Sequence, residues 1–420
     1  MQAVILAAGE SSRCWPINQG HKSQVKIMGK PLVYWTIKGL AKKGIKDIII
    51  IAKPDSKLNG ELGPLSAELG VRLSFVVQEK PLGTGDAISR ASDLIQEPFF
   101  VFWPYKIQSE DMVEKILAKR QEGYEAVLIG TKTATPWDYG ILKLEGERVV
   151  EIVEKPKSGQ EPSSMKVVGT YFLSSDFFEY YQKVKHHPTD FVDALNLYIK
   201  EKKTGFVALE KEPPPLKYCW EFLAIFKTLL ESKEFSQSIA PTASLGKNVV
   251  IDGNVHIGEN VNIGAGTVIS GPCFIGDNCK IGANNVLRGP VNLEKDIVTG
   301  AFTEIKNCLI QKGTHFHSGY FGDSVIGENC RFGAGFITAN RRIDRGSIKS
   351  LVKGKKIDTS LTYFGMVVGH NSCFGIKSGT MPGVLVGSNC LIGPGTLVFE
   401  NIEDETTLYT QFKNIVKKRE

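Results

Sequence analysis

The chain has 420 residues, of which 42% are hydrophobic and 23% charged, and this length and composition fit a soluble globular protein of about two domains. No apolar run is long enough to cross a bilayer, so no membrane segment is expected. The eight cysteines form no C-x-x-C pair, which argues against a zinc ribbon and a disulfide framework. The net charge of +6 is modest and favours phosphorylated small molecules over nucleic acid as ligands.

From residue 1 to residue 235 the chain alternates strand-like apolar runs, such as AVILAA, DIIIIA and PFFVFW, with amphipathic helix-like stretches. This rhythm predicts an α/β domain in which helices cover both faces of a mostly parallel sheet. Its start lacks the basic region and cleavage site of a signal peptide, so we expect a cytoplasmic protein whose first strand is buried. Ligands of such a sheet bind at the carboxyl ends of the strands.

Between residues 236 and 402 single apolar residues recur every six positions. The series consists of Ile251, Ile257, Ile263, Ile269, Ile275, Ile281 and Leu287, and it returns at Phe374, Val386, Ile392 and Val398. A period of six fits neither a helix nor an alternating strand, and it predicts a triangular solenoid with glycine or asparagine at its corners. The register breaks at about 296–316 and 340–361, where we expect surface loops. Residues 403–420 are expected to form a basic tail or helix.

Four motifs follow one another in the first domain: LAAGESSR, KIMGKPLVYW, QEKPLGTGDAI and YGILKLEGERVVEIVEKP. In this order they resemble the sugar-1-phosphate nucleotidyltransferase family, which implies a Rossmann-like fold. The resemblance implies a loop and two basic side chains at the base and phosphates, a turn that selects the base, and a sugar-binding side. The residues implied are Leu6, Ala7, Ala8, Gly9, Arg13 and Lys22; then Gln78, Gly83 and Thr84; then Gly140, Glu154, Lys155 and Gly169.

The first domain departs from that family where the family binds its metal. The two aspartates of the family align with Tyr105 and Pro215, neither of which can bind Mg²⁺. Glu110 or Asp111 could substitute, but both belong to a predicted helix start, where acidic residues are common. We therefore predict no metal site and a nucleotidyl transfer activity in doubt, with Mg²⁺ needed only if that activity exists.

The second domain carries H-x-x-Y-x-G-D-S at 317–324, G-A-G at 333–335, an asparagine at 340 and a lysine-bearing loop at 349–356. These motifs resemble the acetyltransferase half of the bifunctional enzymes that N-acetylate glucosamine 1-phosphate before uridylylating it. The resemblance implies a left-handed parallel β-helix of hexapeptide repeats and a homotrimer. One residue is missing just before His317 relative to the pattern of this family.

The resemblance also assigns roles in the second domain. His317 is expected to be the general base for the attacking amine, because a neutral imidazole can accept its proton. The other residues implied are Tyr320, Asn340 and Lys349 in the catalytic site, Arg288 and Lys306 at the substrate phosphate, and Ala334 and Lys377 at coenzyme A. The lysines at 353, 355 and 356 fit a solvated loop equally well.

The sequence thus predicts acetyl-CoA-dependent N-acetylation of an amino-sugar 1-phosphate, as in UDP-N-acetylglucosamine biosynthesis. UTP or another nucleoside triphosphate is a further candidate substrate of the first domain. Two alternatives remain open: an active nucleoside diphosphate-sugar pyrophosphorylase with an unusual metal site, and a catalytically inert trimeric scaffold or regulatory subunit.

Overall fold

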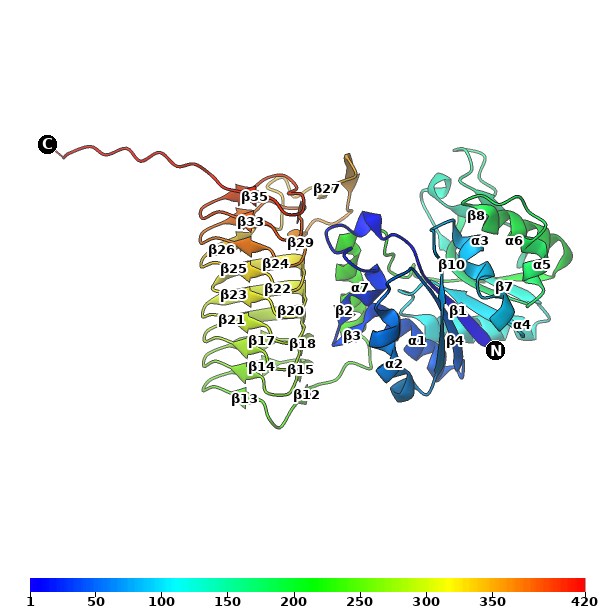
Figure 1. Ribbon diagram of the computed structural model, residues 1–420, viewed down its shortest axis with the longest axis horizontal. Coiled ribbons are helices and arrows are strands. Elements are labelled where there is room, and N and C mark those ends of the chain that lie inside the picture. Colours follow the sequence, from blue (N-terminus) through cyan, green and yellow to red (C-terminus); the bar gives the residue numbers. More distant parts are fainter. Residues whose placement is uncertain (420) are drawn as a thin grey trace. The chain divides into compact units, whose positions relative to one another are not determined.

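The computed structural model describes residues 1–419, which form two compact units (Figure 1). The first unit consists of residues 1–10 and 31–215, and the second consists of residues 11–30 and the chain from Leu216 onward. The division between the units is not the single boundary expected at residue 235. Residues 11–30 and helix α7 (Phe222–Leu230) pack against the strands of the second unit and belong to it. No helix in residues 1–419 is long and apolar enough to span a membrane.

The first unit is built on a nine-stranded sheet of order β5-β4-β1-β6-β10-β7-β11-β9-β8. Its strands are β1 (Gln2–Ala7), β4 (Asp47–Ala52), β5 (Arg72–Val77), β6 (Phe99–Phe102), β7 (Ala126–Lys132), β8 (Gly140–Glu145), β9 (Arg148–Glu154), β10 (Met165–Leu173) and β11 (Thr204–Ala208). Strands β5, β4, β1 and β6 run parallel, whereas β10 runs antiparallel to both its neighbours β6 and β7. The carboxyl ends of β1 and β6 therefore meet at one edge of the sheet.

Helices cover both faces of this sheet, as the sequence predicts. One apolar core includes Ala3 and Ile5 and lies beneath α1 (Leu32–Lys42), α2 (Leu58–Leu69) and α4 (Ser109–Gln121). The other includes Val4 and Leu6 and lies beneath α3 (Thr84–Ser89), α5 (Phe177–Tyr181) and α6 (Asp190–Glu201). Alternate residues of β1 thus enter opposite cores, as the two-residue period of a strand requires.

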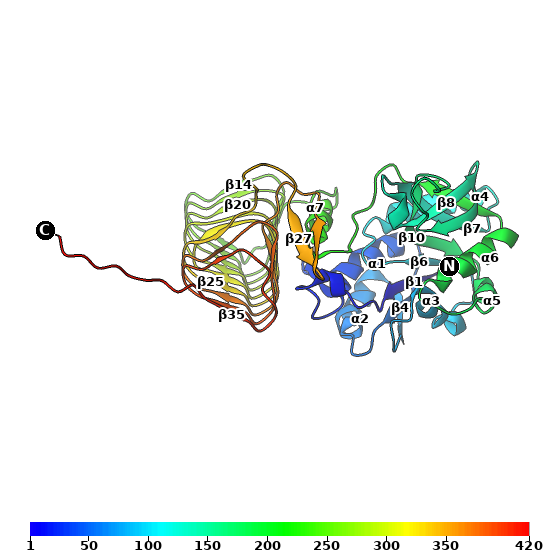
Figure 2. The ribbon, with the colours of Figure 1, turned by 90° about the horizontal axis from the view of Figure 1, so that it is seen from above.

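The second unit is a parallel β-helix with three faces, shown along its axis in Figure 2. Face one is a nine-stranded sheet of β13 (Ser244–Leu245), β16 (Asn262–Ile263), β19 (Lys280–Ile281), β21 (Val298–Thr299), β23 (His315–Phe316), β25 (Arg331–Phe332), β30 (Cys373–Phe374), β33 (Leu391–Ile392) and β35 (Thr407–Leu408). Short strands β2 (Lys26–Ile27) and β3 (Lys30–Pro31) precede the first unit's α1 in the chain.

Faces two and three form one 13-stranded sheet, because three long strands bend through the corner between them. The long strands are β20 (Val286–Leu293), β22 (Thr303–Ile310) and β24 (Gly319–Ile326). Face two also contains β14 (Val250–Asp252), β17 (Val268–Ser270), β26 (Phe336–Thr338), β31 (Gly379–Thr380) and β34 (Leu397–Val398); face three contains β12 (Ser238–Ile239), β15 (Val255–Ile257), β18 (Cys273–Ile275), β29 (Met366–Val368) and β32 (Val384–Val386).

The six-residue period corresponds to one face of the coil. Val250 pairs with Val268 and Val268 with Val286, so a regular coil is three such periods long. The predicted inward residues line one continuous core, in which Ile257, Ile263 and Ile269 are fully buried. The parallel β-helix expected from the sequence is therefore confirmed.

The two register breaks have different structures. At 296–316 the coil continues through β21, β22 and β23 without an excursion, so the loop expected there is absent. At 340–361 the chain does leave the coil and forms a hairpin of β27 (Lys349–Val352) and β28 (Lys355–Asp358). The helix also extends past residue 402, since β35 pairs with β33.

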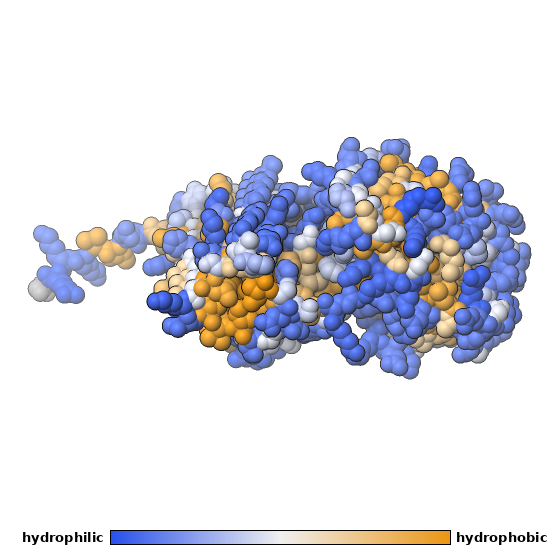
Figure 3. Space-filling view, turned by 90° about the horizontal axis from the view of Figure 1, so that it is seen from below, coloured by the Kyte–Doolittle hydropathy of each residue, from blue (hydrophilic) through white to orange (hydrophobic). Residues whose placement is uncertain are grey.

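The first coil has no cap over its apolar interior within residues 1–419. Figure 3 views the β-helix from the end that carries β12 and β13, where apolar side chains gather. Ile239 and Leu245, which pair with the buried Ile257 and Ile263 of the next coil, are both exposed. The solenoid therefore ends here with its interior open, whereas solenoids are commonly closed by polar terminal repeats.

A column of glycines lines the corner between faces one and two, which we call the first corner. A glycine directly follows every face-one strand except β23 and β35: Gly246, Gly264, Gly282, Gly300, Gly333, Gly375 and Gly393. A Cβ at Gly264 or Gly375 would lie 2.5 Å from a backbone nitrogen of the next coil. Adjacent strands are only about 4.8 Å apart, so this corner leaves no room for a side chain.

We predict that Gly300→Ala destabilises the second unit. Its added Cβ would meet the carbonyl oxygen of His317 on the next coil, and overpacking of this kind costs about 2 kcal/mol of unfolding free energy. Gly346→Ala is the control, because the atom nearest its Cβ is 3.5 Å away. Chemical denaturation should separate the two variants, and equal unfolding free energies would contradict the steric account of the column.

Candidate functional site

His317 occupies the first corner at a level where every neighbouring coil has glycine. Its backbone N–H donates to Phe332 O, as the N–H of Gly300 donates to Phe316 O and that of Gly333 to Phe374 O. The imidazole is exposed, and within residues 1–419 it has no hydrogen-bond or ion-pair partner. A histidine at a position that packing reserves for glycine is therefore free to act on a ligand.

The corner at His317 is also one residue shorter than the others. Thr299 pairs with Phe316 and Thr303 with Gly319, so two residues stand here where three stand in the preceding coil. The next coil again has three, between Phe332 and Phe336. The missing residue lies in the His317 corner itself and not before it, which corrects the position inferred from the sequence.

His315, two residues earlier, has a different environment. Arg331 donates a hydrogen bond to its Nδ1 at 3.0 Å. Burial and the adjacent Arg331 charge both lower the pKa of His315. This histidine is thus tied to face one, whereas His317 remains unbonded at the corner.

Asp323 is the centre of a polar cluster in which Tyr320 and Asn340 meet. Asn340 Nδ2 donates to Asp323 Oδ2 at 2.5 Å and lies 2.9 Å from the Tyr320 hydroxyl. Asp323 is 2% exposed and also accepts from Asn307 Nδ2 at 2.7 Å and from Lys306 Nζ at 3.2 Å. A buried carboxylate with these partners fixes the side chains that surround it.

A cationic column leads up to this cluster along face two. Arg288 pairs in register with Lys306, and Lys306 with Gly322. A Cβ at Gly322 would lie 2.5 Å from the Tyr320 hydroxyl and 2.7 Å from Asn340 Nδ2, so glycine leaves the space that these groups occupy. The structure thus brings Arg288, Lys306, Tyr320 and Asn340 together on face two.

Four residues in or beside the cluster were not assigned roles from the sequence: Asn307, Asp323, Arg341 and Tyr363. Asp323 lies inside the H-x-x-Y-x-G-D-S motif, which was the available signal. The Tyr363 ring lies 4.5 Å from Lys306 Nζ and 4.6 Å from the guanidinium carbon of Arg341. No sequence signal marked Tyr363, because the 341–365 excursion brings it back to face two.

The Tyr320 phenol stays protonated at neutral pH. Burial and the nearby Asp323 carboxylate both raise its pKa. A neutral phenol can donate as well as accept a hydrogen bond. Tyr320 is therefore suited to orienting a polar substrate group, not to accepting a proton.

The residues expected at coenzyme A follow His317 up the first corner. Gly335 N donates to Ser318 O, and Lys377 N donates to Ala334 O. Ala334 and Lys377 therefore occupy the next two levels above the His317 corner, and the Lys377 side chain is exposed. This edge is continuous from the histidine through the glycine turn to the lysine.

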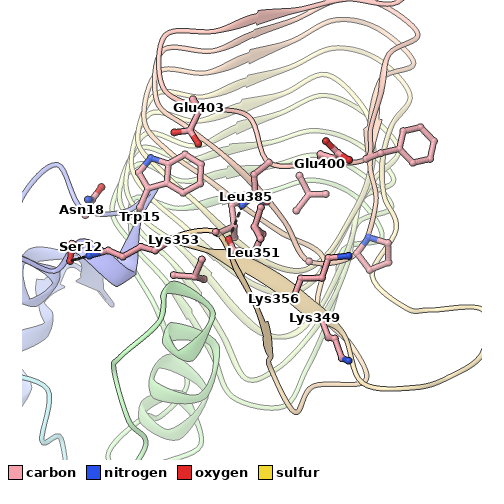
Figure 4. Close-up of a pocket in the computed structure, with 17 residues that line it drawn as sticks. Ser12, Trp15, Asn18, Lys349, Leu351, Lys353, Lys356, Leu385, Glu400 and Glu403 are labelled. Atoms are coloured by element: carbon pink, nitrogen blue, oxygen red, sulfur yellow. Dashed lines mark hydrogen bonds between the residues drawn. The ribbon is translucent and has the colours of Figure 1, made fainter.

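Lys349 lies elsewhere, at the corner between faces two and three. It belongs to the β27–β28 hairpin and lines a cavity of about 670 Å³ with Trp15, Lys356 and Glu400 (Figure 4). Lys353 reaches from the same hairpin to Ser12 Oγ at 2.8 Å. Within the described chain no bond joins Lys349 to His317, Tyr320 or Asn340, so the structure does not bring it to the predicted site.

In the first unit, a cavity of about 230 Å³ lies at the carboxyl ends of β1 and β6. Most residues expected at the nucleotide line it, together with Trp103: Leu6, Ala8, Gly9, Gln78, Gly83 and Thr84. Gln78 Nε2 donates to Gly83 O at 3.2 Å and to Asp86 Oδ2 at 2.8 Å. Ala7 instead faces the core on the other side of the sheet.

Arg13 and Lys22 do not line this cavity, because residues 11–30 belong to the second unit. Lys22 Nζ donates to Leu216 O at 2.5 Å, and burial lowers its pKa. The segment is held by backbone bonds to buried polar side chains, including Met28 N to Asn292 Oδ1 at 2.8 Å. Lys22 therefore bonds within the second unit, and the phosphate contact expected for it stays a prediction.

The residues expected at the sugar are only partly assembled. Gly140 pairs with Glu154, and Lys155 N donates to Tyr139 O, so these three lie at one end of the β8–β9 pair. Gly169 has φ +72° and packs against the indole of Trp103 at the edge of the cavity. Neither Gly140 nor Glu154 lines the cavity itself.

The chain matches the Nucleotidyl transferase family over residues 2–231, the six-repeat bacterial transferase hexapeptide over 238–271, and the hexapeptide repeat of succinyl-transferase over 272–301 and 365–400. It is 34% identical to the bifunctional protein GlmU of Methanococcus vannielii, over the full length of both chains. It is 33% identical to the bifunctional sugar-1-phosphate nucleotidylyltransferase/acetyltransferase of Sulfurisphaera tokodaii, over 96% of this chain and 98% of the relative.

The chain belongs to this family of bifunctional nucleotidylyltransferase/acetyltransferases. It is a transferase of sugar-nucleotide biosynthesis, and its second unit is a left-handed β-helix of hexapeptide repeats. Membership implies an acyl-CoA donor for the hexapeptide unit and Mg²⁺ for nucleotidyl transfer.

The residues present do not fit a magnesium ion. Tyr105, which stands in the position of a family aspartate, stacks on Trp103 with ring centroids 6.5 Å apart. Glu110 pairs with Lys42 at 3.1 Å and Asp111 with Lys115 at 2.6 Å, so both carboxylates belong to surface ion pairs of α4. The substitution by Glu110 or Asp111 considered from the sequence is therefore not supported.

We predict that Asp323→Ala destabilises the second unit by about 2 kcal/mol, since it leaves Lys306, Asn307 and Asn340 without their shared buried acceptor. Asp344→Ala is the matched control, because that carboxylate is exposed and pairs only with its near neighbour Arg342 and the Gly346 N–H. Urea unfolding should show a large loss for the first variant and little for the second. Equal effects would contradict the central position of Asp323.

Proposed function

We propose that the second unit transfers the acetyl group of acetyl-CoA to the amine of an amino-sugar 1-phosphate, with glucosamine or galactosamine 1-phosphate as the candidate acceptor. The observation that carries this proposal is the exposed, unpaired His317 in a glycine column, three residues before Tyr320 in the Asp323 cluster. A purely structural corner would have no steric reason to replace glycine by histidine.

In the proposed reaction the amine nitrogen attacks the thioester carbonyl and its proton passes to the free imidazole of His317. The C–N bond forms, the C–S bond breaks, and the proton is returned to the leaving thiolate. Within residues 1–419 the backbone N–H of Ala334, one level above His317, donates no hydrogen bond, so it is suited to the developing oxyanion, whereas the N–H groups of Gly333 and Gly335 bond between coils. Tyr320 and Asn340 orient the acceptor, because the cluster fixes both.

The acceptor's phosphate is assigned to Arg288 and Lys306. They are adjacent in the face-two column and lie beside the Tyr320–Asn340 pair. A phosphate dianion near this column would meet two cations at once, although each now has an acidic partner: Glu304 for Arg288 and Asp323 for Lys306. Phosphate binding therefore competes with these ion pairs.

Face two also supports a homotrimer. An outward-facing ladder along it exposes Val250 (53%), Val268 (36%), Val286 (37%), Ile337 (59%) and Leu397 (43%). Glu304, Tyr320 and Gly379 interrupt this ladder, so its exposed apolar residues form separate groups, of which Val250, Val268 and Val286 are consecutive. An exposed apolar group of this kind supports an interface. Because His317 and Lys349 lie at opposite edges of face two, a neighbouring copy is the proposed source of the lysine that completes each site.

For the first unit we propose nucleotide or sugar-nucleotide binding without metal-dependent nucleotidyl transfer. The lined cavity at the sheet edge supports binding, and the aromatic pair at Trp103 and Tyr105 argues against the ion that catalysis requires. An active pyrophosphorylase with an unusual metal arrangement remains the second candidate, because the family matches over residues 2–231. A wholly inert scaffold is disfavoured by His317.

Acetyl transfer should depend on His317. We predict that His317→Ala lowers kcat by about 10²-fold to 10⁴-fold with either amino-sugar phosphate, since the general base is lost. His315→Ala is the control, because that imidazole is bonded to Arg331, and it should retain most of the activity. Thiol release from acetyl-CoA measures the rates, and sedimentation checks that the assembly is kept. Absence of turnover in the wild type would favour the scaffold.

Nucleotidyl transfer should be undetectable. We predict no Mg²⁺-dependent pyrophosphate release from UTP, or from the other nucleoside triphosphates, with glucose 1-phosphate or N-acetylglucosamine 1-phosphate. The physical reason is the loss of both metal carboxylates at Tyr105 and Pro215. Pyrophosphate release that disappears on chelation would instead establish the pyrophosphorylase candidate.

A further inference from the structure

The Gln78 side chain is the polar group of the first unit's cavity with the best-defined orientation. Gln78 is 5% exposed, and its carboxamide lies between the cavity and helix α3. Both N–H bonds of Nε2 are used, one to the Gly83 carbonyl at 3.2 Å and one to the Asp86 carboxylate at 2.8 Å.

The partners of Gln78 allow only one orientation of its amide. A carboxylate and a carbonyl can accept hydrogen bonds but cannot donate them. A rotated amide would place Oε1 against two acceptors and leave both without a donor. Asp86 is itself held, because its Oδ1 accepts from Arg90 at 2.9 Å and its side chain is only 16% exposed.

The remaining atom, Gln78 Oε1, is left for a ligand. It has no bonded partner in residues 1–419, and it is not among the buried side-chain atoms that lack one. It is therefore accessible from the cavity that Gln78 lines. The site presents an acceptor and no donor at this point.

We infer that Asp86 is a positioning residue that makes the base pocket select nucleobases with a ring N–H. The inference rests on the nucleotide binding proposed for the first unit, and it adds which nucleobases that site prefers. Uracil and thymine carry such a group at N3, and guanine carries it at N1, whereas cytosine and adenine have an acceptor nitrogen at those positions. Donor bases gain a hydrogen bond to Oε1, and acceptor bases face repulsion between two lone pairs.

The test is the binding of two matched pairs of nucleotides to the full chain without metal. UMP is compared with CMP, and GMP with AMP, by titration calorimetry; the pairs distinguish a pyrimidine from a purine ligand. In the wild type the donor base of the preferred pair should bind about tenfold more tightly than its partner. Asp86→Asn should reduce that ratio several-fold and raise the affinity for the acceptor base, because the introduced amide can donate to Oε1 of a rotated Gln78.

Arg90→Gln is the matched control. It removes the ion pair to Asp86 Oδ1 but leaves Oδ2 for Gln78, so the ratio should stay near that of the wild type. A general loosening of α3 would weaken both bases together and leave the ratio unchanged. A merely structural role of Asp86 would not raise the affinity of the Asp86→Asn variant for the acceptor base, so this gain tests the positioning role directly.

Three results would overturn the inference. If Asp86→Asn leaves the ratio of donor-base to acceptor-base affinity unchanged, Asp86 does not position Gln78. If the wild type does not prefer donor bases, the pocket does not present an acceptor, although nucleotide binding itself stands. Failure of all four nucleotides to bind would overturn the proposed nucleotide binding of the first unit and the inference with it.

Discussion

The close spacing of successive coils is the constraint on which the second unit depends. Backbone groups of one coil lie so near the next at the first corner that a Cβ at Gly264 or Gly375 would collide with a main-chain nitrogen. Glycine therefore repeats at this corner from Gly246 to Gly393, and the departure at His317 coincides with a corner shortened by one residue. A local change in coil length thus coincides with a histidine at a position that the neighbouring coils fill with glycine.

A similar shortening occurs at the opposite edge of face two and builds the cluster beside it. Two residues turn this corner after Arg288, but in the next coil Asn307 alone turns it after Lys306. Asn307 and Asp323, which occupy the corner in successive coils, have φ +48° and +51°. Asp323 is thereby buried within the cluster, and the polar groups proposed to orient the acceptor are fixed before any ligand arrives.

In the function proposed for the first unit, one half of a nucleotide site persists without the other. Gln78, Gly83 and Thr84 line a cavity at the end of β1, with the Gln78 amide fixed by Asp86. After β6, Tyr105 stands where the family has one of its two metal aspartates, and its ring stacks on Trp103. Base recognition and metal-assisted chemistry rest on different strands, so the second can be lost while the first persists.

The sequence predicted the elements whose signals are periodic or local. The six-residue series indicated the β-helix because its inward residues are spaced evenly, and the HxxYxGD motif contained Tyr320 and Asp323 within one strand. Tyr363 was missed because its approach to Lys306 depends on the path of an irregular excursion. Lys22 was assigned to the first domain because no local signal shows that residues 11–30 pack with the second unit. Its phosphate contact stays a prediction. The sequence indicated that one residue is missing near His317. Only the pairing between strands of successive coils shows that the missing residue belongs to the corner itself.

The proposed acetyl-transfer site takes His317 from one copy and Lys349 from a neighbouring one. The decisive measurement is co-assembly of His317→Ala and Lys349→Ala chains, each inactive alone. If two copies form each site, random mixed trimers contain intact pairs at about a quarter of their sites, so thiol release from acetyl-CoA should return to about that share of the wild-type rate. A mixed assembly no more active than its separate components would show that one chain must supply both residues, and the shared site would be wrong.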